Sequence, residues 1–347
     1  MSDSATPPTS LYGGADGGMH MILVTGGAGF IGSNIVAALV GRGAAVAVCD
    51  SLGTEGKWRN LAKSELSDVV APEALMAWLQ QHVDDLETII HMGAISSTSA
   101  IDADLVISTN FKLSRYLWQW CARHGKRFLY ASSAATYGSG AQGYDDDASP
   151  QALAGLRPLN LYGWSKHLFD RRVARAIADH ELVPAQWAGL KFFNVYGPNE
   201  YHKGDMRSVV ARYYTAAASG QEVALFKSCR GDVADGQQKR DFVYVGDCVA
   251  VILWLLDHPA ISGLFNVGTG EARSFADVIG ALFAAVGGPV RISYREMPEA
   301  MREHYQYFTQ ARVDRLREVG FVQPFTSVER GVGQYVEHYL SQPDGYR

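Results

Sequence analysis

The feature that most constrains the fold is a glycine-rich turn between a short apolar run and a helix-like stretch. Met21 to Thr25 is apolar and rich in β-branched residues, glycines follow at Gly26, Gly29 and Gly32, and apolar residues then recur at helical spacing. Gly26 permits a tight turn, Gly29 lets the backbone approach a ligand, and Gly32 lets the helix pack on the strand. Because a helix N-terminus here offers amide donors and a positive dipole, the segment predicts a site for a dinucleotide pyrophosphate.

The same alternation continues along the chain. Further buried strands are predicted at 45–49, 88–91 and 127–131, with helical segments such as 113–123 between them. Strands that alternate with helices build an α/β protein with a doubly wound parallel sheet, the Rossmann arrangement. The later half has no second phosphate loop and is expected to form a smaller, mixed α/β substrate-binding domain.

The predicted division of the chain is a disordered tail at 1–20, a cofactor-binding domain at 21–195 plus about 242–271, and a substrate-binding domain at 196–241 plus 272–347.

Composition narrows the function further. Of the 347 residues, 47% are hydrophobic and 19% charged, and the net charge is −5. That balance lacks the excess of Lys and Arg that phosphate-backbone binding favours, so we expect no nucleic-acid partner. The four cysteines lie far apart, which predicts reduced thiols and neither a disulfide framework nor a metal site. Because there is no signal-peptide pattern and no apolar run of the ~18 residues that a span needs, we expect a cytoplasmic protein without a membrane partner.

Charged residues after the second predicted strand bear on the choice of cofactor. Asp50 lies about twenty residues beyond the glycine turn, where a carboxylate accepts hydrogen bonds from the adenosine ribose of NAD. Lys57 and Arg59 follow in the next loop and could neutralise the 2′-phosphate of NADP. The residues alone leave both NADP and NAD open.

A tyrosine and a lysine four residues apart form the candidate catalytic pair. Tyr162 and Lys166 share one face of a predicted helix, so the ammonium group can favour the phenolate form of the tyrosine. Tyr162 can then take a proton from a substrate hydroxyl while the carbinol carbon gives a hydride to a nicotinamide. Ser133 follows the strand at 127–131 and can hydrogen-bond the same substrate oxygen. The three residues together predict a Ser-Tyr-Lys triad.

On these residues the chain resembles the extended short-chain dehydrogenase/reductases, and within them the ADP-L-glycero-D-manno-heptose 6-epimerases. The likeness runs from about Met21 nearly to the end of the printed sequence. Its more specific segments are Phe192–Pro198, His202–Gly204, Lys239–Val245 and Tyr305–Gln310.

The resemblance implies an epimerase with two acid/base groups, Tyr162 and Lys203, supported by Lys166 and Ser133. It also implies tightly held NADP, oxidation of ADP-heptose at C6″ to a ketone, rotation, and reduction of the opposite face. Two bases suit this reaction, because a group on each face must exchange a proton with the substrate. A part in lipopolysaccharide core synthesis and a homo-oligomer, in this case a pentamer, are implied in the same way.

Two sets of binding residues are carried over from the resemblance. Those expected to bind the cofactor are Gly26, Gly29, Phe30, Ile31, Gly32, Asp50, Ser51, Lys57, Met92, Gly93, Ala94, Ile95, Ser96, Asn110, Tyr162, Lys166, Val195 and Lys203. Those expected to bind the substrate are Ser133, Asn194, Asp205, Arg212, Phe226, Arg240 and Tyr305. Among them Arg240 is suited to a bidentate grip on the diphosphate.

Three places in the substrate half depart from the pattern of these epimerases. Asp205 stands where a small hydroxyl residue is usual, and Arg212 stands where histidine is expected. Phe226–Cys229 replaces a more acidic turn that carries glycine, and the loop at 230–238 is longer. Because the residues for the chemistry are retained, we expect a variant substrate clamp with activity preserved.

Other functions fit these residues less well. A 4,6-dehydratase carries Asp-Glu where this chain has Ala134 and Ala135, so the pair for water elimination is missing. A nucleotide-sugar 4-epimerase shares the triad and the glycine turn, but His202–Gly204 argues against it. A cofactor-binding scaffold without catalysis is compatible with the fold, and the intact triad argues against it.

Overall fold

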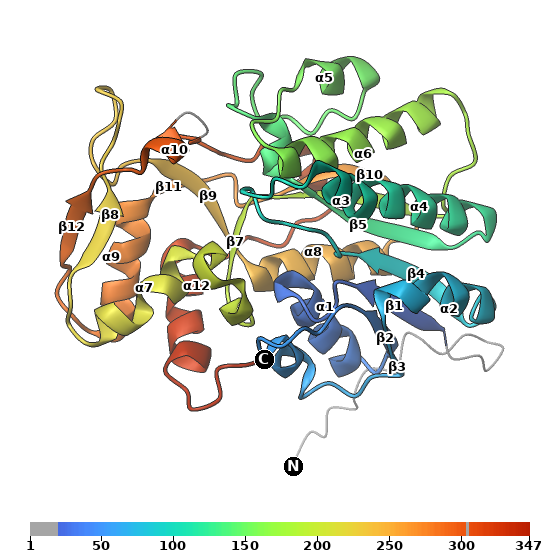
Figure 1. Ribbon diagram of the computed structural model, residues 1–347, viewed down its shortest axis with the longest axis horizontal. Helices are drawn as coiled ribbons and strands as arrows, with labels where there is room; N and C mark the ends of the chain where they lie inside the picture. The colour runs from blue at the N-terminus through green and yellow to red at the C-terminus, as the bar shows by residue number, and fades with distance from the viewer. Residues whose placement is uncertain (1–19, 303–304) are drawn as a thin grey trace, which may run out of the picture.

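A seven-stranded parallel sheet forms the centre of the computed structural model, which describes residues 20–302 and 305–347 (Figure 1). The tail expected at 1–20 therefore lies, apart from residue 20, outside the described residues. The strand order is β10-β6-β5-β4-β1-β2-β3. These strands are β1 (Met21–Thr25), β2 (Ala45–Cys49), β3 (Asp68–Val70), β4 (Leu86–His91), β5 (Arg127–Ser133), β6 (Trp187–Phe192) and β10 (Gly263–Val267). The doubly wound parallel sheet predicted from the sequence is confirmed.

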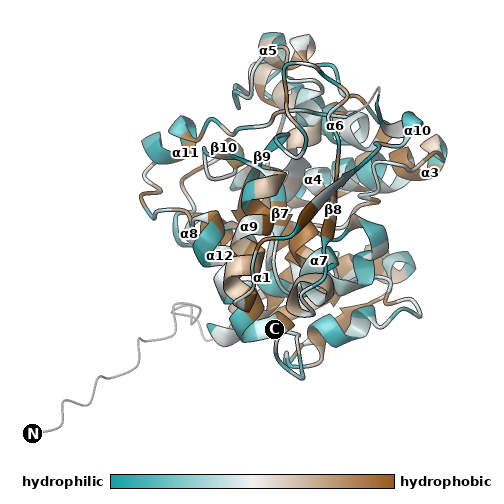
Figure 2. Ribbon diagram, turned by 90° about the vertical axis from the view of Figure 1, so that its left-hand side faces the viewer, coloured by the Kyte–Doolittle hydropathy of each residue, from teal (hydrophilic) through white to brown (hydrophobic). Residues whose placement is uncertain are grey.

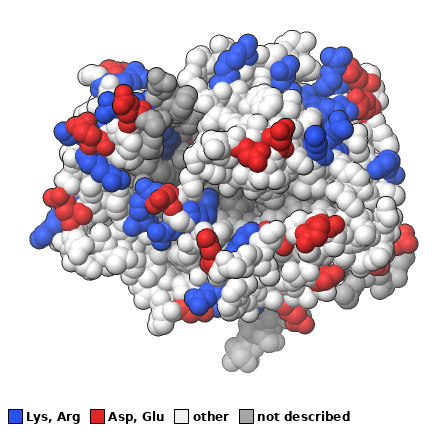
Figure 3. Space-filling view, viewed as in Figure 1, with Lys and Arg blue, Asp and Glu red and all other residues white. Residues whose placement is uncertain are grey.

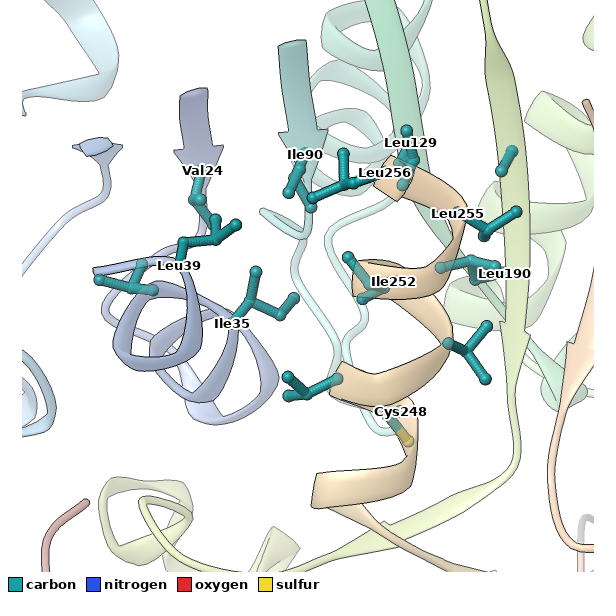
Figure 4. Close-up of a cluster of buried hydrophobic side chains, with 14 of the residues drawn as sticks. Val24, Ile35, Leu39, Ile90, Leu129, Leu190, Cys248, Ile252, Leu255 and Leu256 are labelled. Carbon is teal, nitrogen blue, oxygen red and sulfur yellow. The ribbon is translucent and has the colours of Figure 1, made fainter. Parts of the chain in front are cut away.

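Helices cover both faces of this sheet. One face packs against α1 (Phe30–Gly41), α8 (Val245–Asp257) and the short α11 (Asp314–Glu318). The other face packs against α2 (Leu75–Gln81), α4 (Leu113–Arg123) and α6 (Leu161–Ala178). Figure 4 shows Ile35 of α1 and Ile252 of α8 lying in one apolar layer under the strands. Burying this layer supplies the main driving force for closing α1 and α8 onto the sheet.

A second, smaller region packs around a hydrophobic core of its own. It contains a three-stranded sheet of order β11-β9-β7 and a two-stranded sheet of β12 and β8. Their bounds are β7 (Asn194–Tyr196), β8 (Val223–Phe226), β9 (Lys239–Tyr244), β11 (Ala272–Ser274) and β12 (Ile292–Arg295). The helices of this core are α7 (Val209–Ala218), α9 (Phe275–Val286) and α12 (Val328–Tyr335). In Figure 2 the hydrophobic stretches of α9 and the neighbouring strands lie toward the middle of the molecule.

Short elements connect the two regions and the sheet strands. They are η1 (Lys57–Leu61), η2 (Pro72–Ala74), α3 (Ala103–Ile107), the π-helical turn η3 (Ser108–Lys112), η4 (Ala134–Tyr137), α5 (Pro150–Gly155), η5 (Tyr201–Met206), α10 (Glu299–Arg302) and the π-helical turn η6 (Val336–Leu340). In the described part of the chain, no helix is both long and apolar enough to span a bilayer.

Candidate active site

The glycine turn between β1 and α1 has the geometry that its spacing predicts. Gly26 has a φ of +66°, a conformation that favours glycine. A Cβ on Gly32 would lie 2.1 Å from the Gly26 carbonyl oxygen, so the helix could not approach the strand with any larger residue there. No side chain caps the N-terminus of α1, and its first turn carries no acidic residue. The turn therefore fits a dinucleotide pyrophosphate, because its amide donors are left for an anion.

The end of β2 places a carboxylate and an ammonium group beside this turn. The amide of Ala28 donates to Asp50 Oδ2 at 2.9 Å, and Lys57 Nζ donates to Asp50 Oδ1 at 2.6 Å. Lys57 also donates to the carbonyl of Ser51 at 3.1 Å. Since both an acceptor and a cation face the same place, the site offers a partner to a ribose hydroxyl and to a ribose phosphate.

Asn110 supports the loop after β4 from behind. Its side chain accepts from the Ile95 amide at 2.8 Å and donates to the Ile95 carbonyl at 3.0 Å. It also donates to Ser165 Oγ at 3.0 Å, and Ser165 in turn donates to the carbonyl of Tyr162 at 2.7 Å. Asn110 is fully buried, and its hydrogen bonds to Ile95 and Ser165 join this loop to α6.

The three residues of the predicted triad come together at the carboxyl edge of the sheet. Helix α6 begins after Asn160, whose side chain accepts from the Gly163 amide at 2.8 Å and so fixes the first turn that carries Tyr162. Lys166 follows one turn later on the same face. Ser133 is the last residue of β5. Regular elements therefore position all three side chains.

The electrostatics of the triad differ from the sequence argument in one respect. Burial raises the pKa of Tyr162, while a hydrogen bond with Ser133 lowers it and Asp170 raises it. Burial lowers the pKa of Lys166 to about 8, with Asp170 opposing the shift. The spacing of Tyr162 and Lys166 predicts that Lys166 lowers the pKa of Tyr162. In the structure, Ser133 provides the lowering, and burial outweighs it.

Lys203 lies in η5, an irregular six-residue segment that bends at Gly204 (φ 51°, ψ −124°). Its ammonium group lies 5.5 Å from the centre of the Phe30 ring, over the start of α1. Burial lowers the pKa of Lys203, and Glu200 partly opposes this. The second predicted acid/base group is thus brought next to the glycine turn from a distant part of the chain.

A cavity of about 700 Å³ joins these groups. Figure 3 shows the molecule hollowed near the middle of this face, with Lys and Arg side chains gathered at its left. The predicted site residues that line the cavity are Gly26, Gly29, Phe30, Ile31, Gly32, Asp50, Lys57, Met92, Gly93, Ala94, Ser96, Ser133, Tyr162, Lys166, Asn194, Val195 and Lys203. Those outside its lining are Ser51, Ile95, Asn110, Asp205, Arg212, Phe226, Arg240 and Tyr305.

Arg240 forms a separate cationic position on β9. It is 6% exposed, and its guanidinium lies 5.1 Å from the centre of the Tyr305 ring and 5.8 Å from that of Phe275. One guanidinium nitrogen donates to the carbonyl of Lys239 at 2.9 Å. Its charge faces two aromatic rings and one carbonyl. A buried cation of this kind favours an anionic ligand.

The three departures from the family pattern also have defined surroundings. The side chain of Arg212 donates to the carbonyl of Asp205, so two of the departures contact each other. The Phe226 ring lies under the guanidinium of Arg295 at 4.8 Å. Lys227 pairs with Glu296 at 2.9 Å on the outer side of the two-stranded sheet.

Several cavity-lining residues were not singled out from the sequence. They are Ser97, Thr98, His202, Met206, Arg207, Ser208, Phe242, Phe275 and Gln306. His202, Phe242 and Gln306 lie inside segments that carry the family resemblance, which was the available signal for them. Gln306 donates to the carbonyl of Gly138, a contact between distant loops that no local pattern reports.

Comparisons with known proteins agree with this geometry. Residues 22–268 match the NAD dependent epimerase/dehydratase family. An ADP-L-glycero-D-manno-heptose-6-epimerase of Fusobacterium nucleatum is 44% identical over 335 residues, which cover 94% of this chain and 100% of that protein.

Two solved structures have a similar fold. The ADP-L-glycero-D-manno-heptose-6-epimerase of Helicobacter pylori has a TM-score of 0.74 and 28% identity, over 92% of this chain and 96% of that one. The UDP-glucose 4-epimerase of Thermus thermophilus, solved with NAD, has a TM-score of 0.73 and 28% identity, over 92% of this chain and 98% of that one. The resemblance drawn from the motifs is confirmed, and the chain belongs to the NAD dependent epimerase/dehydratase family.

Proposed function

We propose that this protein is an ADP-glycero-manno-heptose 6-epimerase that inverts C6″ of a nucleotide sugar. One observation carries the proposal: a single cavity is lined by two acid/base groups from unrelated elements, Tyr162 from α6 and Lys203 from η5, beside the glycine turn. A group on each face suits an inversion that presents the two faces of the carbon in turn, whereas reduction of one face needs only one such group. The identity to proteins named for this activity supports the same assignment.

A nicotinamide dinucleotide is the cofactor that the glycine turn fits. When bound, it would supply a hydride acceptor and later a hydride donor to the same carbon, so that no net oxidation occurs. The turn and the start of α1 would hold its pyrophosphate, and Asp50 its adenosine ribose. We favour NADP. Lys57 lies beside Asp50, where the adenosine ribose would bind, so its ammonium group could neutralise a 2′-phosphate there. NAD is the alternative.

The protein groups then handle the protons. Tyr162 removes the proton from the C6″ hydroxyl, and Ser133 donates a hydrogen bond that stabilises the oxygen as its charge changes. Lys166 supports Tyr162 and the nicotinamide ribose. After rotation of the sugar, Lys203 delivers a proton to the oxygen on the other face. Because burial lowers the pKa of Lys203, its ammonium group is a better proton donor than an exposed lysine.

Substrate binding falls to the smaller region. Arg240, a buried cation with Tyr305 beside it, would grip the diphosphate from outside the described cavity lining, and Asn194 lines the cavity next to the triad. Asp205, Arg212 and Phe226 would form the variant clamp. We propose residues 21–195 plus about 242–271 as the cofactor-binding domain and 196–241 plus 272–347 as the substrate-binding domain. A homo-oligomer, a pentamer by resemblance, stays a prediction.

The test uses the purified protein without added cofactor, incubated with ADP-D-glycero-β-D-manno-heptose. Configuration at C6″ is followed by NMR and reduced cofactor by absorbance. Conversion to a mixture of both epimers without net NADPH change supports the proposal. No conversion after NADP and NAD are each supplied, together with inversion of a UDP-sugar at C4″, would assign a 4-epimerase instead.

Two variants show whether the activity depends on the described cavity. Tyr162→Phe is expected to abolish conversion, whereas Tyr116→Phe, which removes a phenol of α4 outside the cavity, is expected to behave as wild type. Conversion by Tyr162→Phe at the wild-type rate would contradict the role of the cavity.

A further inference from the structure

The final residues of the printed sequence run from the smaller region back to the cofactor side of the sheet. The chain leaves the smaller region after η6, and its last residues lie beside α1 (Figure 1). Residues 344–347, here called the tail strap, lie on the surface, and residues 345–347 are half-buried. They contact two parts of the molecule that the sheet does not join: the segment that carries Lys203, and the elements α1 and η1.

The first set of contacts holds the Lys203 segment. Tyr201 OH donates to the Gly345 carbonyl at 2.7 Å, and the rings of Tyr201 and Tyr346 meet edge to face at 5.2 Å. The amide of Arg347 donates to Asn199 Oδ1 at 3.0 Å. The strap therefore grips the chain on the N-terminal side of Lys203 at two points.

The second set anchors the strap on the cofactor half. Arg347 Nη1 donates to Asn34 Oδ1 of α1 at 3.2 Å. Lys63, just after η1, donates to the Tyr346 carbonyl at 2.6 Å and pairs with Asp344 at 2.9 Å. A displacement of Lys203 away from α1 would thus have to break the strap's contacts at one end or the other.

The Lys203 segment needs such support because it lies outside every sheet and long helix. Backbone hydrogen bonds around it are short-range, from Lys203 N to the Glu200 carbonyl at 3.1 Å and from Arg207 N to the Gly204 carbonyl at 3.3 Å. Asn199, at its start, has a φ of +73°, which few non-glycine residues adopt. Side-chain and strap contacts, more than backbone regularity, therefore determine where the ammonium group lies.

We propose that the tail strap is a positioning element for Lys203, and that Tyr346 and Arg347 are positioning residues for the second proton transfer. The proposal rests on the proposed function, because it assigns Lys203 a proton transfer. Misplacement of a reacting group by about 1 Å can lower a rate by about 100-fold, so a surface contact of this kind can control turnover. The triad has no contact with the strap and is expected to keep its geometry.

The test compares the full chain with a variant that lacks residues 345–347. Each epimer of ADP-heptose is mixed separately with the holoenzyme, and the single-turnover rise in reduced cofactor is recorded together with kcat and KM for epimerisation. For the truncated protein we expect kcat to fall about 10- to 100-fold, with KM within about 2-fold. The epimer whose hydroxyl proton is removed by Tyr162 should be oxidised at the wild-type single-turnover rate. The epimer whose proton is removed by Lys203 should be oxidised slowly.

The matched control is Gln342→Ala. Gln342 lies in the same stretch, but its side chain donates only to the Glu337 carbonyl and to Ser341 Oγ. This variant is expected to match wild type in every measurement. Arg347→Ala, which removes only the contact to Asn34, is expected to show the same asymmetry between epimers in a weaker form.

The possible outcomes separate the two proposals. Equal slowing of both epimers, or wild-type kcat after truncation, would overturn the strap proposal while leaving the epimerase assignment intact. If wild type converts neither epimer, the proposed function fails, and hydrogen exchange still tests the strap. Faster exchange of residues 198–206 in the truncated protein than in the full chain supports the strap, and unchanged exchange overturns it.

Discussion

The two proposed acid/base groups are supported in different ways. Tyr162 lies on an eighteen-residue helix packed against the seven-stranded sheet, so its position follows from regular backbone hydrogen bonds and a large core. Lys203 lies on a six-residue segment that Asn60 contacts at His202 and the tail strap contacts at Tyr201. The difference shows that one half of the site is fixed by the fold itself, whereas the other half depends on a few polar contacts.

Each half has a characteristic buried feature. Beneath the triad, Lys191 pairs with Asp170 at 2.9 Å, both side chains fully buried, and Lys191 also donates to Thr136 at 2.6 Å. Beside Lys203, Asn60 donates to the carbonyls of Ala28 and Asn199 at 2.9 and 3.1 Å. A buried ion pair holds the first half, and a neutral amide the second.

The largest effect is expected from removing the acid/base groups one at a time. Tyr162→Phe and Lys203→Met should each lower kcat for epimerisation by about 1,000- to 10,000-fold, because general acid–base catalysis accounts for factors of this order. Single-turnover absorbance should show that each variant fails to oxidise a different epimer of the substrate. If both variants fail with the same epimer, the division of the site into two halves is wrong.

Breaking the buried ion pair should produce the next largest effect. Lys191→Met leaves the Asp170 carboxylate buried without its cation, which is expected to cost about 3 kcal/mol of unfolding free energy in urea titrations. The double variant with Asp170→Asn should recover part of the loss, because no charge is then left unpaired. Full stability of Lys191→Met would contradict the importance of this pair for the triad side.

Removal of the amide on the Lys203 side should have a smaller effect on stability and a selective effect on rate. Asn60→Ala removes a donor shared by two buried carbonyls, which is expected to cost about 1–2 kcal/mol. Its kcat should fall about 10-fold with the same epimer asymmetry as Lys203→Met. Equal slowing with both epimers would show that Asn60 acts on the cofactor side alone.

The smallest effect concerns pH and compares a histidine from each half. Burial is the main cause that lowers the pKa of His91, under the triad, to about 3 and that of His202, beside Asn60, to about 4. The unfolded chain has the ordinary value near ~6.5 and binds more protons below it. Each histidine therefore stabilises the fold above that pH, and the contribution is lost as pH falls toward the folded pKa, by at most ~1.4 kcal/mol per pH unit.

Urea unfolding at pH 7 and pH 6 measures this contribution. His91→Asn and His202→Asn should each flatten the dependence of unfolding free energy on pH by about 1 kcal/mol or less over that interval. An undiminished slope in both variants would show that other groups, such as His167 with its pKa lowered to about 4 mainly by burial, dominate the titration.

Local sequence patterns were sufficient to predict the half that the fold fixes. The apolar run at 21–25, the glycine spacing and the alternation of strands and helices indicated the parallel sheet, since each signal has a short period. The four-residue spacing of Tyr162 and Lys166 likewise placed both on one helical face. Strand β4 begins at Leu86 and β5 extends to Ser133, so only the ends of these elements differ from the prediction.

The other half could not be predicted in the same way. The contacts of Asn60 with Asn199 and of Asn34 with Arg347 join residues more than a hundred positions apart, and single polar side chains have no periodicity. Lys203 itself was reached only through a family resemblance. The contacts of Phe275 and Tyr305 with Arg240 could not be predicted for the same reason, because these residues lie far apart in the sequence and meet only in the folded structure.

The separate core of the smaller region has a consequence for substitutions. Helix α7 and strand β8, which carry Arg212 and Phe226, pack into that core and not into the layers that hold the triad. Substitutions there can therefore change the proposed clamp without altering the packing beneath the triad. The three departures in this chain lie in that region or next to it, so altering the proposed clamp would not require the large sheet to be repacked.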